Sequence, residues 1–401
     1  MSKRLFALLV ATCACLVPAV AQVLPQPPEI AARSYLLLDV TANQILAARE
    51  IDRPVEPASL TKLMTAYLMF DALRLGKMNL RQALPVSERA WRQPGSRMFI
   101  DSRMRVPVDD LLKGLIVQSG NDAAIALAEG VAGTVERFVH LMNEQAHALG
   151  MTSTTFRNPT GLTAAGHTTT ANDLSILATR LMRDFPEYLH YYAIKKYHYE
   201  GTPAANDSNR NLLLLRDPSV DGLKTGHTLA AGFCLIATAR RDFPNLGAAP
   251  RGSGEPAVAG PRRLLVIVLG AASENARANE SQKLLNWGFT EFEAIKLFEA
   301  DQAVVGPAIW KGKASTARLG RSQAIVVAVP AGSAAKLLTR VERPEPLVAP
   351  LNKGQQVGRL KIALGEQSLV DVPLLSLDTV EEAGILGRAW DAMRLWLRKA
   401  N

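Results

Sequence analysis

The sequence predicts an α/β (α+β) fold for a large first domain, followed by a small all-β domain and a C-terminal amphipathic helix. Three observations lead to this prediction. Strand-like and helix-like apolar patterns are mixed between residues 33 and 294, whereas short apolar runs separated by turn residues fill 295–384. Residues 385–401 place apolar and basic side chains on opposite sides of an ideal helix. A length of 401 residues fits two or three domains.

Residues 1–21 have the pattern of a cleaved secretory signal. Lys3 and Arg4 precede an apolar run over residues 5–20, and Ala19-Val20-Ala21 supplies small residues for cleavage. A retained membrane anchor is the alternative, but the run is shorter than the ~20 apolar residues that a spanning helix needs. Residues 22–32 are rich in proline and are expected to form a linker. We therefore expect an exported protein.

Composition and charge limit the classes of molecule that the protein is expected to bind. Apolar residues make up 48% and charged residues 21% of the chain, which is the ordinary mixture of a globular protein. The formal net charge of +9 favours an anionic lipid or wall polymer, and export argues against nucleic acid. Signal cleavage would leave Cys234 alone, so no internal disulfide is expected. Cys234 lies in an apolar strand-like run and is predicted to be a core thiol rather than a nucleophile.

The elements of the first domain follow from the period of its apolar residues. A hairpin is expected from strands at 35–40 and 44–47. Four helices are expected at 60–75, 108–117, 122–131 and 171–183, with Thr170 opening the last. Two strands at 232–240 and 263–269 are followed by a helix that begins at Ser281. Between these strands, residues 247–261 are rich in Gly, Pro and Ala and predict a long loop that alters surface contacts rather than chemistry.

Strands of the second domain are expected where its apolar runs fall, at 324–329, 338–341, 357–362 and 369–375. In the tail, two tryptophans share a face with other apolar residues and oppose basic ones, which favours a helix lying in a membrane interface. A helix packed against its own domain is the alternative. Length and charge exclude a spanning helix. The apolar face consists of Ile385, Leu386, Ala389, Trp390, Met393, Trp396 and Leu397.

Three short motifs carry the chemistry, and their order and spacing make the combination specific. They are Ser59-Leu60-Thr61-Lys62, Ser119-Gly120-Asn121 and Lys224-Thr225-Gly226. A serine hydroxyl needs a base to attack, and residues three apart on a helix share a face, so Lys62 can reach Ser59. Burial and the nearby Lys224 would lower the pKa of Lys62. The structural alternative is that each motif only shapes the fold. Ser59 would then be a helix N-cap, Ser119-Gly120-Asn121 a turn between two helices, and Lys224-Thr225-Gly226 a turn that opens a strand.

The remaining motif residues have roles that suit acyl transfer. Ser119 could relay a proton to the leaving amine, and Asn121 could hold a lysine and the substrate backbone. Thr225 offers a hydroxyl to a substrate carboxylate, and Gly226 permits close approach of the backbone. The N–H groups of Ser59 and His227 could form an oxyanion hole.

With these motifs, the chain resembles the D-alanyl-D-alanine carboxypeptidase group of low-molecular-mass penicillin-binding proteins (peptidase S11 type). The likeness includes the segments around the three motifs, Asn209-Arg210-Asn211, the run from Arg277 to Phe289 and the tail from Gly384. It implies a serine β-lactamase/DD-transpeptidase-like domain with helices over an antiparallel sheet. It also implies a C-terminal β domain and a membrane-surface helix on the periplasmic face of the inner membrane.

The resemblance further implies a reaction. Ser59 would be acylated by a peptidoglycan pentapeptide stem, D-alanine would leave, and water would hydrolyse the acyl-enzyme. Penicillins and other β-lactams would bind covalently, without a cofactor or metal. Arg277 would help to bind the terminal carboxylate, although Ala278 stands where an acidic residue often follows it, and a surface strand-end position is its alternative. Arg210 would shape the site or form a structural ion pair.

Four other functions compete with this interpretation. A class A β-lactamase would need a Glu-x-x-Leu-Asn segment, and Glu187-Tyr188-Leu189 lacks the asparagine. A DD-endopeptidase shares the chemistry, but its relatives typically lack the C-terminal domain. A non-catalytic wall-binding scaffold would not need an intact trio of motifs. A metalloenzyme is disfavoured because the six histidines form no His-Glu-x-x-His pattern, and His140 with His147 suits one face of an amphipathic helix.

Overall fold

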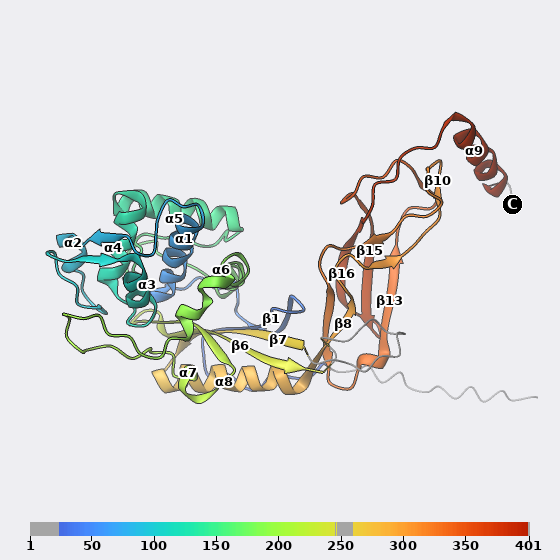
Figure 1. Ribbon diagram of the computed structural model, residues 1–401. Coiled ribbons are helices and arrows are strands. Elements are labelled where there is room, and N and C mark those ends of the chain that lie inside the picture. Colours follow the sequence, from blue (N-terminus) through green and yellow to red (C-terminus); the bar gives the residue numbers. More distant parts are fainter. Residues whose placement is uncertain (1–23, 245, 247–259, 400–401) are drawn as a thin grey trace, which may run out of the picture.

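The computed structural model describes residues 24–244, 246 and 260–399. The expected signal, residues 1–21, lies outside the described residues, as do 247–259 of the expected loop. Within the described parts, a mixed domain is followed by a β domain and a terminal helix (Figure 1). This confirms the predicted fold class.

A five-stranded antiparallel sheet is the centre of the first domain. Its strand order is β2-β1-β7-β6-β5, so the N-terminal hairpin forms one edge and the strand with the third motif forms the other. The strands are β1 (Ser34–Asp39), β2 (Gln44–Arg49), β5 (Val220–Thr228), β6 (Gly232–Phe243) and β7 (Gly260–Ala271).

Helices cover both faces of this sheet. Figure 1 shows the long helix α8 and the short α7 (Leu213–Arg216) along one face, and the other long helices of this domain stacked on the opposite face. Leu36 and Leu38 contact the helical cluster, whereas Leu37 between them contacts the side of α8, as the alternation of a strand requires. The long helices are α1 (Lys62–Arg74), α3 (Val108–Ile116), α4 (Asn121–Ala132), α5 (Val135–Leu149), α6 (Ala171–Asp184) and α8 (Glu274–Glu291).

Shorter elements complete the domain and carry part of the site. They are the 3-10 turns η1 (Ala58–Thr61) and η2 (Pro186–Ala193), the helices α2 (Glu88–Trp91) and α7 (Leu213–Arg216), and the hairpin β3 (Ala83–Pro85) with β4 (Arg105–Pro107).

The predicted hairpin and helices are confirmed, with two informative differences. The helix expected over 60–75 is preceded by η1, so Ser59 lies on a tight turn. Helix α8 begins seven residues before the expected Ser281, because the Ser273 hydroxyl accepts the Ala276 N–H and caps it. Thr170 caps α6 in the same way, as predicted.

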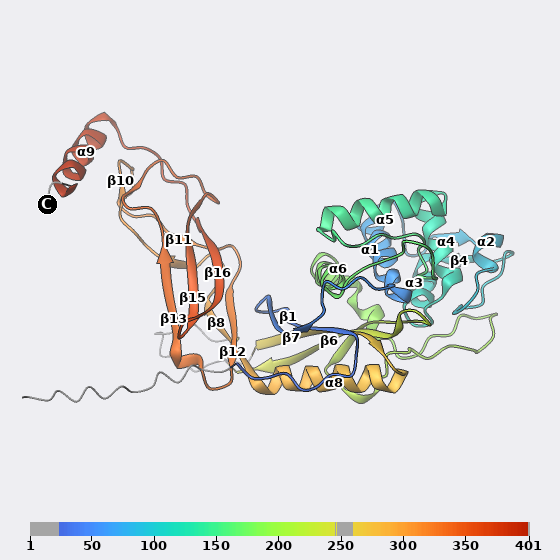
Figure 2. The same ribbon diagram turned by 180° about the vertical axis from the view of Figure 1, so that it is seen from behind.

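The second domain starts without a linker, since α8 ends at Glu291 and β8 begins at Phe292. Strand β8 (Phe292–Phe298) pairs with β12 (Ile325–Pro330) at the base of the domain, beside the end of α8 (Figure 2). A five-stranded sheet has the order β13-β15-β16-β11-β9, and β10 pairs with β14. These strands are β9 (Ala303–Val305), β10 (Ile309–Trp310), β11 (Leu319–Gly320), β13 (Leu337–Glu342), β14 (Leu347–Val348), β15 (Gln356–Leu364) and β16 (Gln367–Ser376), with a 3-10 turn η3 (Ala334–Lys336).

The side chain of Gln44 contacts the second domain directly. The Gln44 amide donates to the carbonyl oxygen of Ala328 at 3.3 Å and accepts the N–H of the same residue at 2.7 Å. Gln44 thereby adds a two-bond contact between β2 and β12, the strand that pairs with β8.

Helix α9 (Ile385–Lys399) lies at the far end of the β domain from the first domain (Figure 1). Asp391 accepts the N–H of Lys311 at 2.7 Å, and the Arg394 guanidinium lies over the ring of Trp310. Its apolar stripe is largely exposed, including Leu386 and Trp396. Among the described residues, no helix combines the length and hydropathy needed to cross a bilayer.

Candidate active site

Ser59 lies on the turn η1, between two glycines from other segments. A Cβ atom added to Gly161 would collide with the carbonyl oxygen of Ala58, and Gly161 also has a φ of +86°. A Cβ atom added to Gly226 would lie 3.2 Å from Ala58 Cβ and 3.3 Å from the Leu60 nitrogen. Only glycine permits both approaches without displacing the turn. Gly226 therefore lets β5 approach η1, the turn that carries Ser59. This is a second reason for glycine here, besides the expected close approach of the strand backbone to a substrate.

Lys62 reaches three oxygen atoms with one amine. Its Nζ lies 3.2 Å from Ser59 Oγ, 2.7 Å from Asn121 Oδ1 and 2.6 Å from the Thr160 carbonyl oxygen. The predicted Ser59–Lys62 and Lys62–Asn121 contacts are thus present, whereas the contact with Thr160 was not predicted. Lys62 is 1% exposed, so water does not compete for these positions.

Burial lowers the pKa of Lys62 to about 7, with Asp122 opposing the shift and Arg210 adding to it. A neutral amine has two N–H groups and one lone pair. The Asn121 and Thr160 oxygens can only accept hydrogen bonds here, because the Asn121 Nδ2 donates to the Pro94 carbonyl at 2.6 Å. Both N–H groups of neutral Lys62 are then engaged, and its lone pair faces the Ser59 hydroxyl.

The second motif forms the junction between α3 and α4, as predicted. Ser119 has a φ of +56°, and its Oγ accepts a hydrogen bond from Lys224 Nζ at 2.9 Å. Lys224 also donates to the Thr225 carbonyl at 3.0 Å. Burial and the neighbouring Lys62 cation lower the pKa of Lys224 well below its usual value. Each of the two buried lysines therefore contacts one serine hydroxyl, Lys62 that of Ser59 and Lys224 that of Ser119.

A loop before the second motif is fixed by one carboxylate. Asp122 accepts the N–H groups of Met98, Phe99 and Ile100 at 3.0, 2.8 and 3.3 Å. Asp122 is fully buried, and its burial raises its pKa despite these donors. The loop therefore remains beside Asn121, which also donates its own N–H to the Ser96 carbonyl.

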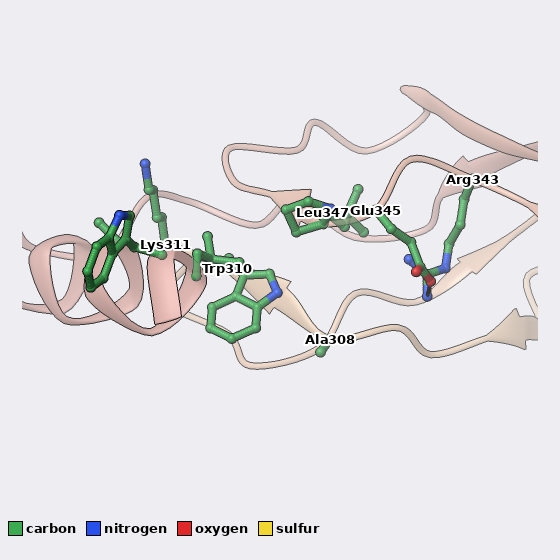
Figure 3. Close-up of a pocket in the computed structure, with 10 residues that line it drawn as sticks. Ala308, Trp310, Lys311, Arg343, Glu345 and Leu347 are labelled. Carbon is green, nitrogen blue, oxygen red and sulfur yellow. Dashed lines mark ion pairs between the residues drawn. The ribbon is translucent and has the colours of Figure 1, made fainter. Parts of the chain in front are cut away.

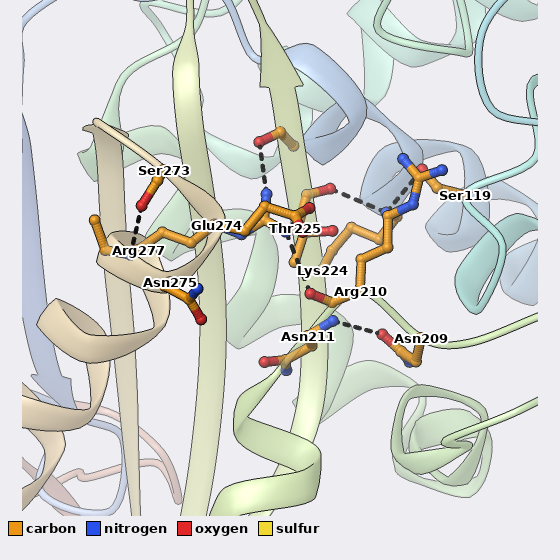
Figure 4. A network of polar contacts seen from close by, with 12 residues as sticks. Ser119, Asn209, Arg210, Asn211, Lys224, Thr225, Ser273, Glu274, Asn275 and Arg277 are labelled. Atoms are coloured by element: carbon orange, nitrogen blue, oxygen red, sulfur yellow. Dashed lines mark hydrogen bonds and ion pairs between the residues drawn. The ribbon is translucent and has the colours of Figure 1, made fainter. Parts of the chain in front are cut away.

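Arg277 lies on α8 behind the third motif and is 2% exposed, so the surface strand-end alternative is wrong. It donates to the carbonyl oxygens of Gly226 and Arg210 at 3.4 and 3.2 Å, and to Glu274 at 3.0 Å (Figure 4). Glu274 precedes Arg277 by one helical turn and supplies the acidic partner that Ala278 cannot.

Two further side chains complete this edge. His227 is exposed and stacks on Phe233 with ring centroids 4.0 Å apart, and the guanidinium of Arg277 lies over the same ring. Thr225 is buried between Lys224 and Gly226 on β5. Arg210 donates to the Asn206 side chain at 2.6 Å, a hydrogen bond to a neutral amide rather than the ion pair of the structural alternative.

Two other candidates, Cys234 and His140, add no reactive group to this cluster, although Cys234 pairs with Gly226 in the sheet. Cys234 is 1% exposed, and burial raises the pKa of its thiol, as expected of a core residue. His140 pairs with Glu144 on the exposed side of α5. Across the described part of the chain, no group of three or more His, Cys, Asp or Glu side chains could hold a metal ion.

Sequence comparisons match both domains. The family model described as D-alanyl-D-alanine carboxypeptidase matches residues 21–248, and the one described as penicillin-binding protein 5, C-terminal domain, matches residues 292–382. The D-alanyl-D-alanine carboxypeptidase DacC of Escherichia coli is 39% identical over 91% of this chain and 88% of that protein.

Solved structures agree with these matches. Penicillin-binding protein 5 from Haemophilus influenzae superimposes with a TM-score of 0.80 at 34% identity, covering 89% of this chain and 100% of that one. Penicillin-binding protein D2 from Listeria monocytogenes, in an ampicillin-bound form, gives a TM-score of 0.55 at 29% identity over 66% of this chain and 100% of that one. The second match covers a smaller share of this chain than the first.

Proposed function

Because this chain belongs to the D-alanyl-D-alanine carboxypeptidase family, we propose that it removes the terminal D-alanine from peptidoglycan pentapeptide stems through an acyl-enzyme on Ser59. The observation that carries this proposal is the set of contacts at Lys62, whose two acceptors leave its lone pair directed at Ser59 Oγ. The enzyme is a serine-type carboxypeptidase, and no cofactor enters the reaction.

Acylation begins when Lys62 takes the Ser59 proton and the oxygen attacks the carbonyl carbon between the two D-alanines. The N–H groups of Ser59 and His227 are proposed to hold the oxyanion that forms. Collapse of the intermediate breaks the C–N bond, and the proton taken up by Lys62 passes by way of Ser119 to the departing amine, which returns Lys62 to its neutral form. The 2.9 Å bond between Ser119 and Lys224 supports this relay.

Hydrolysis repeats these steps with water as the nucleophile. Water loses a proton to Lys62, the ester bond to Ser59 breaks, and the Ser59 oxygen regains a proton. A β-lactam enters the same sequence at acylation, and its ring opens instead of releasing an amine. Covalent binding of penicillins is accordingly part of the proposal.

The terminal carboxylate is proposed to bind where cations and a hydroxyl meet on β5. Thr225 offers its hydroxyl, and Lys224 and Arg277 supply positive charge. Arg277 is held by Gly226 O and Glu274, which fixes the guanidinium without exposing it to solvent. Asn121 is proposed to bind the substrate backbone as well as Lys62.

Export and attachment to the periplasmic face of the inner membrane are also proposed, with α9 lying in the interface. Support comes from its exposed apolar stripe and from two tryptophans, Trp310 and Trp396, that line a hollow of about 720 Å³ between α9 and the β domain (Figure 3). Truncation after Gly384 tests this idea. A truncated protein that still sediments with membranes after signal cleavage would contradict it.

Mass spectrometry of an uncross-linked pentapeptide stem tests the activity. Incubation with the parent protein is expected to remove one D-alanine, and Ser59→Ala is expected to remove none. A cross-linked dimer stem serves as the second substrate. Cleavage of the dimer alone, by a protein that penicillin still labels at Ser59, would favour the endopeptidase. If the protein cleaves neither substrate and penicillin does not label it, the wall-binding scaffold is favoured.

A further inference from the structure

One of the two acceptors of Lys62 is a backbone atom, the Thr160 carbonyl oxygen, and it stays in place only if its turn does. The turn spans residues 158–162. Its start is tied to α1 by Thr65, whose hydroxyl donates to the Pro159 carbonyl at 2.8 Å. This bond lies before the peptide plane that faces Lys62, so it does not by itself orient that plane.

The side chain of Asn158 closes the turn on itself. Its Oδ1 accepts the N–H of Thr160 at 3.1 Å, the hydroxyl of Thr160 at 2.8 Å and the N–H of Gly161 at 2.7 Å. Its Nδ2 donates to the Leu162 carbonyl at 2.8 Å. Four bonds from one amide flank the Thr160–Gly161 peptide on both sides and restrict its rotation.

His167 fixes which way the Asn158 amide points. His167 Nδ1 lies 3.3 Å from Asn158 Nδ2 and 3.4 Å from the Arg157 nitrogen, and both of these atoms are donors. Nδ1 is therefore an acceptor, and the proton lies on Nε2, which is 3.0 Å from the Thr61 hydroxyl. Burial lowers the pKa of His167 to about 4, which keeps the ring neutral.

Packing holds the turn on one face only, since Gly161 lies against the Ala58 carbonyl while the opposite face borders a hollow. Asn158, Thr160 and Leu162 line a cavity of about 370 Å³ that Ile125 and Val139 bound on the other side. A cavity supplies no atoms against which the turn could rest. On that face the hydrogen bonds of Asn158, rather than packing, restrain the turn that presents the Thr160 carbonyl.

We propose that Asn158 is a positioning residue for acylation: it holds the Thr160 carbonyl against Lys62, so that the lone pair of the neutral amine faces Ser59. The inference rests on the proposed function, because it requires Lys62 to act as the base. Asn158 acts through Thr160. Its loss is therefore expected to lower the rate of acylation rather than to remove a group that touches the substrate.

The first test compares Asn158→Ala with a matched control, Asn143→Ala. The Asn143 amide also clamps backbone, since it donates to the Val139 and Phe156 carbonyls and accepts the Phe156 N–H. Both variants are expected to melt at a lower temperature than the parent. Only Asn158→Ala is expected to react with a fluorescent penicillin more slowly per folded molecule, by roughly 10- to 100-fold, since small misplacements of reacting groups cost about that much.

The second test is the pH profile of Asn158→Asp. Aspartate keeps the acceptor for Thr160 and Gly161 and adds a negative charge behind the carbonyl that faces Lys62. The other charged groups acting on Lys62 are Asp122, Arg210 and Lys224, and they are unchanged. The added charge stabilises the protonated form of Lys62. The acid limb of the pH profile, where the acylation rate rises with pH, is therefore expected to move to higher pH by roughly one unit. An unshifted limb would show that the side chain at position 158 does not act on Lys62, which contradicts the geometry on which the inference rests.

The outcomes separate this inference from the proposed function. A parent protein that penicillin does not label, or that it labels equally in Ser59→Ala, would overturn both. If penicillin labels only Ser59 and Asn158→Ala reacts at the parent rate, the positioning role of Asn158 is overturned but the proposed function is not. If Asn158→Ala does not fold, Asn158→Asp decides, and an unshifted acid limb counts against the inference.

Discussion

Arg262 Nε donates to Asp39 Oδ2 at 2.7 Å, and neither side chain is exposed to solvent. Arg262 also donates to the Phe292 carbonyl, at the first residue of β8, and its guanidinium lies over the rings of Phe243 and Phe289. The pair thus links β7, β1 and the start of the second domain at a place that is closed to solvent.

Replacing one partner of this pair is expected to destabilise the folded protein strongly. In Arg262→Met the Asp39 carboxylate remains buried without its cation, so the free energy of unfolding should fall by about 3–5 kcal/mol. Urea denaturation followed by circular dichroism measures the change. Asp39→Ala with Arg262→Met together should lose less than the sum of the two single variants. Additive losses would show that the two charges do not depend on each other.

The rate of acylation should rise with pH around neutrality. Burial places the pKa of Lys62 at about 7, and only the neutral amine can take the Ser59 proton. Below pH 7 the rate constant should fall about tenfold per pH unit, as expected of one essential base. Stopped-flow reaction with a chromogenic cephalosporin between pH 5 and 9 provides the profile. A flat profile across that range would exclude Lys62 as the base.

His167 should make the fold sensitive to acid. Burial keeps the pKa of His167 at about 4 in the folded state, below the ordinary histidine value of 6.5. The unfolded chain therefore binds an extra proton between these values, and stability is present above pH 6.5 and lost as the pH falls toward 4. The contribution is about 3 kcal/mol at most. His167→Gln should show a shallower loss of stability over this window in urea titrations, and an unchanged slope would contradict the assignment.

The two glycines around Ser59 should differ in tolerance. Gly161→Ala introduces a Cβ atom that collides with the Ala58 carbonyl, whereas Gly226→Ala introduces contacts of 3.2–3.3 Å that a small shift can relieve. Gly166→Ala is the control, because Gly166 also has a positive φ but its nearest neighbour is the flexible end of Arg157. Acylation per folded molecule should fall most in Gly161→Ala, less in Gly226→Ala and least in the control. Equal losses in Gly161→Ala and Gly166→Ala would point to backbone strain alone.

Much of the site could be predicted from side chains, whereas the unpredicted contact of Lys62 is made by the backbone. The three motifs could be recognised because each combines reactive residue types at a short spacing, and they meet in the structure as expected. Thr160 contributes a carbonyl oxygen, which every residue possesses, so no residue type marks it. Asn158-Pro159-Thr160-Gly161 has the composition of a turn, and that signal could have located the turn but not its contact with Lys62.

The limits of the fold prediction have similar causes. The 3-10 turn at Ser59 begins with Ala58 at a φ of +48°, a conformation that alanine rarely adopts and that only the surrounding contacts impose. Strands β6 and β7 continue to Phe243 and Gly260, beyond the apolar runs that predicted them, because their polar outer residues still pair with each other.

The direct passage from α8 into β8, together with the contact of Gln44 with Ala328, has a mechanical consequence. A domain on a flexible tether searches a volume, and its local concentration depends on the length of that tether. Here the β domain is joined to the enzyme by continuous secondary structure. If α9 rests on the membrane, the catalytic serine works at a set height above it. Stems within that layer of the wall, rather than all stems in the periplasm, are then its substrates.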